Sequence, residues 1–305
     1  MQLVFSQILI ILLYVLVGFA AGRLKLITPE QRKYLSGLCS TLILPFTILS
    51  ASSQNVGGQQ MRGMMVALVF LLAAYLCVTL VSMAVHRAAG APPEMRAAVT
   101  SLLTYPNCTF LGLPLCRALF GDMAVLYNAS ALIAFNVLFF TIQHSLFTGG
   151  RASVRSLLTP SMVSTVALIG MLAAGLHFPA PVQTVCSGIG AMITPLSLII
   201  IGVMLSESAL STVLRQKKSY LITALRNLVI PLAGMLVLRL LPLDSDSRLC
   251  VLVYLACPCA TLTSIYAIRY DMEPELAARS VVMSTLFFAL SLPLVLSVGM
   301  RFLGQ

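Results

Sequence analysis

The sequence predicts an all-α integral membrane protein with ten transmembrane helices, arranged as two inverted five-helix repeats in which the fourth and ninth helices are broken. This prediction rests on an apolar composition, on ten apolar runs of membrane-spanning length, and on proline motifs that recur in the second half of the chain. Of the 305 residues, 59% are hydrophobic and 9% are charged, whereas a soluble domain carries about 25% charged residues. Such a composition cannot cover a water-facing surface, which excludes a soluble enzyme, a disulfide-rich secreted module and a disordered chain.

Ten apolar runs follow one another along the chain. The hydrocarbon core of a bilayer is about 30 Å thick, so a helix needs about 20 mainly apolar residues to cross it. The runs cover residues 4–22, 34–51, 63–85, 97–120, 122–148, 161–177, 183–206, 219–241, 248–269 and 276–299. We therefore expect ten spans with short loops between them.

The basic residues indicate how the spans are oriented. Twelve of them lie in loops after odd-numbered spans, namely Arg23, Lys25, Arg32, Lys33, Arg87, Arg96, Arg151, Arg155, Arg215, Lys217, Lys218 and Arg269. Five lie after even-numbered spans or at the C-terminus, namely Arg62, Arg117, Arg239, Arg248 and Arg301. Because Lys and Arg gather in cytoplasmic loops, we expect both termini outside a plasma membrane. The net charge of +10 thus indicates topology and not a nucleic-acid partner.

Two further arginines lie inside spans. Arg226 and Arg279 are one to two helical turns from the cytoplasmic ends of their spans, where a long basic side chain can snorkel to the interface. We expect snorkelling for both, with a substrate-facing arginine as the alternative. All nine Asp and Glu residues fall in loops or at span ends. A proton relay or a hard-cation site usually needs a carboxylate near mid-membrane, so both are disfavoured.

Proline motifs of the first half recur in the second. Pro45 has a counterpart in Pro195, and Pro106 in Tyr-Pro-Asn-Cys-Thr has one in Pro258 in Cys-Pro-Cys-Ala-Thr, at offsets of 150 and 152 residues. Prolines are common in membrane helices, so chance recurrence is the alternative explanation. The shared neighbouring residues favour a repeat.

The repeat divides the chain into two halves of five spans. The expected halves are residues 1–148 and 161–305, joined by a cytoplasmic linker at 149–160. An odd number of spans inverts the second half in the membrane. Inverted repeats with interrupted helices are typical of secondary transporters, which bind substrate near the midplane where the halves meet.

The prolines also indicate where substrate binds. Proline removes a backbone donor and clashes with the preceding turn, so the fourth and ninth spans should break at Pro106 and Pro258. Such breaks persist where they are buried or line a wet cavity. We expect free backbone amides and half-helix N-termini there, and both attract anions. The expected substrate-binding residues are the polar or small ones beside the breaks and in the middle of the fifth span, namely Asn107, Thr109, Gly112, Asn136 and Thr261.

Other functions receive less support from the residues. The chain lacks the metalloprotease, serine-hydrolase and P-loop patterns, so we expect no enzyme activity and no cofactor. Cys257-Pro258-Cys259 resembles the ion-path motif of copper-transporting P-type ATPases, and thiolates would select Cu(I). The chain has no nucleotide-binding segment to accompany it, so we expect no metal site and keep a soft-metal transporter only as a less favoured alternative.

One segment resembles a known family. Asn107-Cys-Thr-Phe-Leu-Gly-Leu-Pro114 is similar to the Asn-x-x-Phe-x-Gly-x-Pro segment in the fourth span of the auxin efflux carrier family, which includes bacterial malate and malonate permeases and the plant PIN-FORMED exporters. The resemblance implies ten helices in two inverted repeats, with spans four and nine crossing at Pro106 and Pro258. It also implies elevator-like transport of small organic anions, with Asn107 near the substrate and Asn136 as a matching polar residue. The long hydrophilic loop of the plant exporters is absent here, which favours a bacterial-type carrier.

The sequence therefore predicts a secondary carrier or uniporter for mono- or dicarboxylates. The expected partners are a small organic carboxylate and the lipid bilayer, with no nucleic acid, and a homodimer is left open. A non-transporting sensor built on the same fold is the alternative from another functional class.

Overall fold

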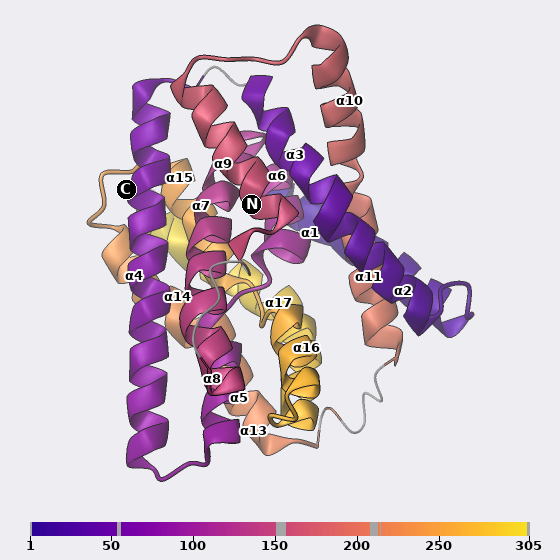
Figure 1. The fold of residues 1–305 in the computed structure, drawn as a ribbon, viewed down its shortest axis with the longest axis vertical. Coiled ribbons are helices and arrows are strands. Elements are labelled where there is room, and N and C mark those ends of the chain that lie inside the picture. Colours follow the sequence, from indigo (N-terminus) through magenta and orange to yellow (C-terminus); the bar gives the residue numbers. More distant parts are fainter. Residues whose placement is uncertain (1, 54–55, 151–156, 208–212, 214, 304–305) are drawn as a thin grey trace. The chain divides into compact units, whose positions relative to one another are not determined.

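The computed structural model describes residues 2–53, 56–150, 157–207, 213 and 215–303 (Figure 1). These residues form helices and loops and no β-strand; their one extended pairing is an isolated antiparallel bridge between Pro106 and Cys259. Arg151, Arg155 and the middle of the expected linker lie outside the described residues.

The helices follow the predicted spans in order. Those of the first half are α1 (Gln2–Arg23), α2 (Pro29–Leu38), η1 (Cys39–Ile43), α3 (Leu44–Ser50), η2 (Ala51–Ser53), α4 (Gly58–Ala88), α5 (Pro93–Thr104), η3 (Cys108–Gly112), α6 (Leu113–Phe120), α7 (Met123–Leu138), η4 (Phe139–Gln143) and α8 (His144–Thr148). Those of the second half are α9 (Pro160–Ala173), α10 (Ala180–Ala191), α11 (Ile193–Glu207), α13 (Lys217–Ala224), η6 (Leu225–Val229), α14 (Ile230–Leu238), α15 (Ser245–Ala256), α16 (Thr261–Arg269) and α17 (Pro274–Leu303). The fourth and ninth spans are interrupted, as the prolines predict.

Within the part of the chain that the structure describes, six helical stretches are long and apolar enough to cross a bilayer. They are Pro29–Ser53, Gly58–Ala88, Met123–Thr148, Ala180–Glu207, Lys217–Leu238 and Pro274–Leu303. Three shorter apolar stretches accompany them, namely Leu9–Arg23, Cys108–Phe120 and Pro160–Ala173. The chain therefore has the character of a multi-pass membrane protein, and the count of ten spans stays a prediction.

Prolines explain most of the irregular helix segments. Three of the four π-helical segments of the described chain, η1, η3 and η6, end two residues before a proline, namely Pro45, Pro114 and Pro231. A proline has no N–H to donate and its ring pushes the carbonyl four residues earlier out of line, so the hydrogen-bond ladder widens just before it. These three π-segments are thus encoded locally, and one of them, η6, contains Arg226.

The chain forms two compact units, and neither corresponds to one half of the sequence. Unit 1 comprises residues 1–65, 109–133 and 158–208, and unit 2 comprises 66–108, 134–157 and 209–305. Each unit therefore takes segments from both halves. The division into repeats is a property of the sequence, and its proposed boundaries stay a prediction.

In unit 1, α1 packs closely against α11. A Cβ placed on Gly18 would collide with the carbonyl of Ile199, and one on Gly202 would collide with the carbonyl of Val15. Small residues at such spacing let helix backbones approach each other in a membrane. The small-residue pattern of α1 thus packs two helices of the same chain.

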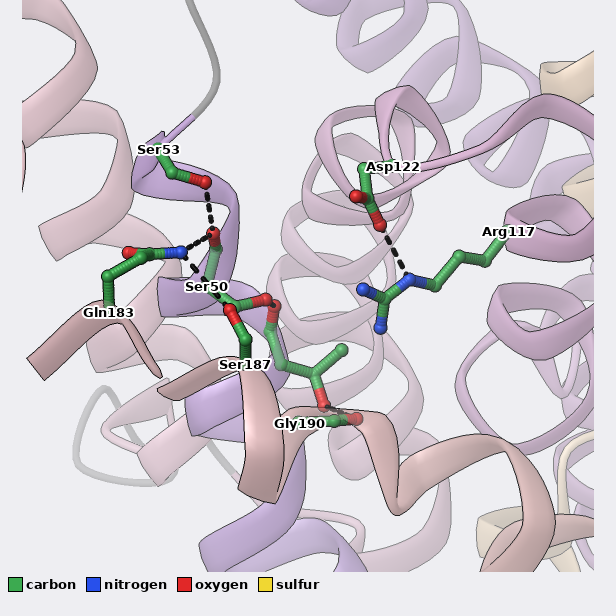
Figure 2. A network of polar contacts seen from close by, with 8 residues as sticks. Ser50, Ser53, Arg117, Asp122, Gln183, Ser187 and Gly190 are labelled. Atoms are coloured by element: carbon green, nitrogen blue, oxygen red, sulfur yellow. Dashed lines mark hydrogen bonds and ion pairs between the residues drawn. The ribbon is translucent and has the colours of Figure 1, made fainter. Parts of the chain in front are cut away.

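Unit 1 also contains the polar network drawn in Figure 2, which joins α3 to α10. The Gln183 side-chain amide donates to the carbonyl of Ser50 at 2.7 Å, and the Thr47 hydroxyl lies 3.0 Å from the carbonyl of Gly190. A Cβ on Gly190 would lie 2.8 Å from the Thr47 Cα. The helix that contains Pro45 therefore packs directly on the helix that precedes Pro195.

Unit 2 contains α5, most of α4, and α13 to α17. Figure 1 shows α4 as one long helix, in violet. Tyr105, at the end of α5, packs edge-on against Phe135 and Phe139, with ring centroids 5.3 and 5.0 Å away. These rings connect the end of α7 and the start of η4 to the break in the fourth span.

Candidate substrate site at the paired helix breaks

The breaks in the fourth and ninth spans pair with each other through their backbones. The amide of Asn107 donates to the carbonyl of Pro258 at 2.7 Å, and the amide of Ala260 donates to the carbonyl of Tyr105 at 2.9 Å. These two bonds form the antiparallel bridge between Pro106 and Cys259. The groups that the prolines free from their helices thus satisfy one another, as buried backbone groups must.

The pairing has the symmetry of an inverted repeat. A two-fold axis that relates each residue to the one 152 positions later would exchange Pro106 with Pro258 and Asn107 with Cys259. The observed pair of Pro106 with Cys259 then becomes the pair of Pro258 with Asn107, which is also hydrogen-bonded. Equivalent segments that meet antiparallel are expected where such an axis passes through the crossing.

Arg226 holds both breaks from one side. Its Nε donates to the carbonyl of Cys257 at 3.0 Å and its Nη2 to that of Leu255 at 2.8 Å. Its Nη1 donates to the carbonyls of Leu103 and Thr104 at 3.0 and 3.4 Å. The last carbonyls of a helix lack intrahelical partners and carry partial negative charge. One guanidinium therefore caps the C-terminal ends of α5 and α15 together.

This geometry corrects the expectation that Arg226 snorkels. The Arg226 side chain is fully buried, and all three of its nitrogens donate to backbone carbonyls, so it reaches neither the interface nor a substrate. Arg279 differs, because it is partly exposed and pairs with Glu275 at 2.7 Å. The two arginines lie at similar depths in their predicted spans, so depth does not indicate which side chain is buried. The neighbouring residue does not separate them either, because each arginine is followed directly by a polar residue, Asn227 or Ser280.

The tenth span supports the ninth-span break through Ser284. The hydroxyl of Ser284 accepts from the amide of Cys259 at 3.1 Å, and its carbonyl accepts from the side-chain amide of Asn227 at 2.8 Å. A further bond of 2.8 Å joins the hydroxyls of Ser101 and Thr263. Hydrogen bonds between segments therefore account for Ser284, Ser101 and Thr263 without a substrate.

Of the predicted site residues, two asparagines have the features of a binding site. Asn107 and Asn136 are each 5% exposed, and the side-chain amide nitrogen of each is buried without a hydrogen-bond partner. A buried donor without an acceptor is costly, unless a ligand supplies the acceptor. Both residues belong to unit 2, and the rings of Phe135 and Phe139 connect the helix of Asn136 to Tyr105 beside Asn107.

The other predicted residues differ in position. Thr261 is the first residue of α16 and is partly exposed. Pro106 and Pro258 lie at the paired breaks. Thr109 and Gly112 belong to η3 and are assigned to unit 1.

The expectation that free backbone amides line the breaks needs correction. The amides of Asn107, Cys259 and Ala260 all donate to protein acceptors. Proline exposes backbone groups, but the antiparallel pairing and Ser284 use them again. In the first turn of α16, the amide of Thr263 also has an acceptor, the carbonyl of Ala260 at 3.1 Å. What remains for an anion is the start of α16 at Thr261 and Leu262, where helix amides lack intrahelical acceptors, together with the asparagine side chains.

Two further buried polar groups are not among the residues that the sequence predicts for the site. Asn128 on α7 is fully buried in unit 1, and neither atom of its side-chain amide has a partner. Tyr75 on α4 is fully buried in unit 2, and its hydroxyl is unpartnered. Each is a single polar residue in an apolar run, a pattern that does not distinguish a buried side chain from an interfacial one.

The thiols beside Pro258 do not form a recognisable metal centre. Cys257 and Cys259 are fully buried, and the Cys257 thiol donates to the carbonyl of Val253 at 3.3 Å. Within the described residues, no group of three or more His, Cys, Asp or Glu side chains could hold a metal ion. The structure adds no support to soft-metal transport.

Comparison with known families decides the class of protein. A family model described as a membrane transport protein matches residues 3–156 and again residues 149–296. The chain belongs to this membrane transport family, that of the auxin efflux carriers. The two matches together cover nearly the whole chain and fit an inverted repeat. The resemblance of the fourth-span segment is thereby confirmed. No curated protein matches the chain.

Proposed function

We propose that this member of the membrane transport family is a plasma-membrane carrier for small organic carboxylates, with both termini outside. The observation that carries the proposal is the pair of buried, unpartnered amide nitrogens of Asn107 and Asn136 in the unit that holds the paired breaks. Each offers N–H donors and no charge, which suits a carboxylate acceptor. The first turn of α16 at Thr261 adds partial positive charge.

The distribution of charge supports an anion over a cation. The charged side chain at the breaks is the guanidinium of Arg226, and its partners are four carbonyls. The described ion pairs join other residues, namely Arg32 with Glu207, Arg117 with Asp122 and Arg279 with Glu275. A cation would need a carboxylate or free carbonyls at this depth, and the carbonyls named here are already occupied.

The two compact units suit an elevator-like mechanism. In such a mechanism, one part of the protein carries the site across the membrane while another part stays in place. Here the paired breaks and their supporting bonds from Arg226 and Ser284 all lie within unit 2. The site can thus travel with its own scaffold, without breaking the bonds that shape it.

The deciding experiment is a flux panel in proteoliposomes. The purified chain is reconstituted, and uptake of radiolabelled malonate, malate and monocarboxylates is measured with and without proton and sodium gradients. We expect saturable carboxylate flux above that of protein-free liposomes. An anion leaving an inside-negative vesicle gains about 2.3 kcal/mol per charge per 100 mV, so efflux should follow the imposed potential. Binding without flux would indicate a sensor on the same fold, and neither binding nor flux would overturn the proposal.

A further inference from the structure

Among the described residues, no acidic side chain forms an ion pair with Arg226. The C-terminal end of a helix carries about half a negative charge, and both α5 and α15 end at the breaks. Together the two ends amount to about one negative charge, which would repel an anion. The guanidinium of Arg226 bonds directly to carbonyls at both ends and offsets that charge.

Only the second repeat contributes a buried arginine to the crossing. At the offset of 152 residues, the position in the first half that corresponds to Arg226 is Ala74. The pseudo-symmetric crossing therefore carries one fixed charge and not a balanced pair. With the two C-terminal ends neutralised, the first turn of α16 at Thr261 is left as a source of positive potential.

We infer that Arg226 is the residue that makes the paired breaks select anions, and that it does so through the field and not by contact. All three guanidinium nitrogens of Arg226 already donate to backbone carbonyls, so none is left to bind a substrate directly. Arg226 is therefore a positioning residue, which holds the helix ends that carry the substrate-binding groups. The inference rests on the proposed carboxylate transport. It deepens that proposal by assigning charge selectivity to a residue outside the predicted binding set.

The test compares substrates of one skeleton and three charges. Uptake of malonate, its monomethyl ester and uncharged malonamide is measured for the wild type, Arg226→Gln and Arg226→Lys. Arg279→Gln, which removes a partly exposed charge of the same unit, is the matched control. Thermal unfolding and size-exclusion profiles in detergent select the variants that are folded.

Arg226→Gln should lower the preference for the dianion over the monoester, and for the monoester over the amide, by roughly tenfold per substrate charge. Arg226→Lys retains the charge, so it should keep the order of preference while losing rate, because an ammonium cannot span four carbonyls on two helices. Arg279→Gln should leave the ratios unchanged. A residue with a structural role alone would lower all three fluxes together at constant ratios, and that result in folded Arg226→Gln overturns the inference.

If Arg226→Gln does not fold, a second variant tests whether the charge of Arg226 sets the selectivity. Asn227→Asp places a carboxylate next to Arg226 in the sequence. It removes the donor to the Ser284 carbonyl, but none of the four hydrogen bonds of Arg226 involves Asn227, so it should reduce the same ratios. Wild-type ratios in folded Asn227→Asp would overturn the inference. Failure of the proposed function is a different outcome, because the wild type itself would then move none of the carboxylates tested.

Discussion

Arg226 and Asn107 bond to adjacent carbonyl groups of the ninth-span break. The Nε of Arg226 donates to Cys257 at 3.0 Å, and the backbone amide of Asn107 donates to Pro258 at 2.7 Å. The buried cation and the main candidate for substrate contact are therefore attached to one short stretch of backbone. Changes that loosen this stretch should affect folding and binding together, whereas changes to the Asn107 side chain should affect binding alone.

Removing the Arg226 side chain should be strongly destabilising. Arg226→Met leaves four buried carbonyls without donors, and a single buried group left unsatisfied costs about 1–3 kcal/mol. We expect a loss of at least about 3 kcal/mol, read as a lower unfolding midpoint in detergent. Glu275→Gln, which breaks only the partly exposed pair with Arg279, should cost less than about 1 kcal/mol. Equal effects of the two changes would contradict this role of Arg226.

Asn107 should govern carboxylate affinity without governing stability. Its side-chain amide nitrogen has no partner within the protein, so Asn107→Ala removes no internal bond of that group. A hydrogen bond to a charged ligand contributes about 1.5–3 kcal/mol, so KM for the transported carboxylate should rise about tenfold or more. Asn107→Asp should have a larger effect, because a carboxylate would repel the substrate. An unchanged KM in folded Asn107→Ala would remove this residue from the site.

Gly202 should tolerate no side chain. A Cβ there would overlap the backbone of α1 at Val15 and Phe19, so Gly202→Ala must separate α1 from α11. Overpacking of this kind costs about 1–3 kcal/mol. Gly188→Ala is the matched control on α10, because a Cβ at that position meets nothing within 4 Å. Thermal unfolding of both variants distinguishes the two sites, and equal midpoints would contradict the packing.

Asp244 should make stability depend on pH in the acidic range. Burial raises the pKa of its carboxyl, but hydrogen bonds from the Ser247 hydroxyl and from nearby backbone amides outweigh burial and hold the pKa below its ordinary value. Because the folded-state pKa lies below the unfolded value of about 3.9, this group stabilises the fold above that pH. The contribution is lost as the pH falls through the folded-state pKa.

Asp244→Asn provides the measurement for this prediction. The difference in unfolding temperature between the wild type and the variant should be constant near neutral pH and should shrink below about pH 4. Asp246→Asn, in the first turn of the same helix, serves as the comparison. A difference that stays the same down to about pH 3 would show that Asp244 acts only as a neutral cap.

The sequence predicted the class of fold because its main signals are local or periodic. Apolar runs of bilayer length, basic loops and the matched prolines are each visible without knowledge of distant contacts. Prolines at 106 and 258 remove specific backbone bonds wherever they occur in a helix, so the broken spans follow from the chain itself. The family match to residues 3–156 and 149–296 agrees with the repeat inferred from those prolines.

Tertiary structure decided how the broken ends are satisfied. Whether the freed amides of Asn107, Cys259 and Ala260 would face a substrate or find partners depended on the antiparallel pairing of segments about 150 residues apart in sequence. The role of Arg226 had the same origin, since an arginine two turns inside a span can reach the interface or turn inward. Four carbonyls from two different helix ends make the inward position favourable. No local sequence pattern around Arg226 indicates that those two helix ends lie together.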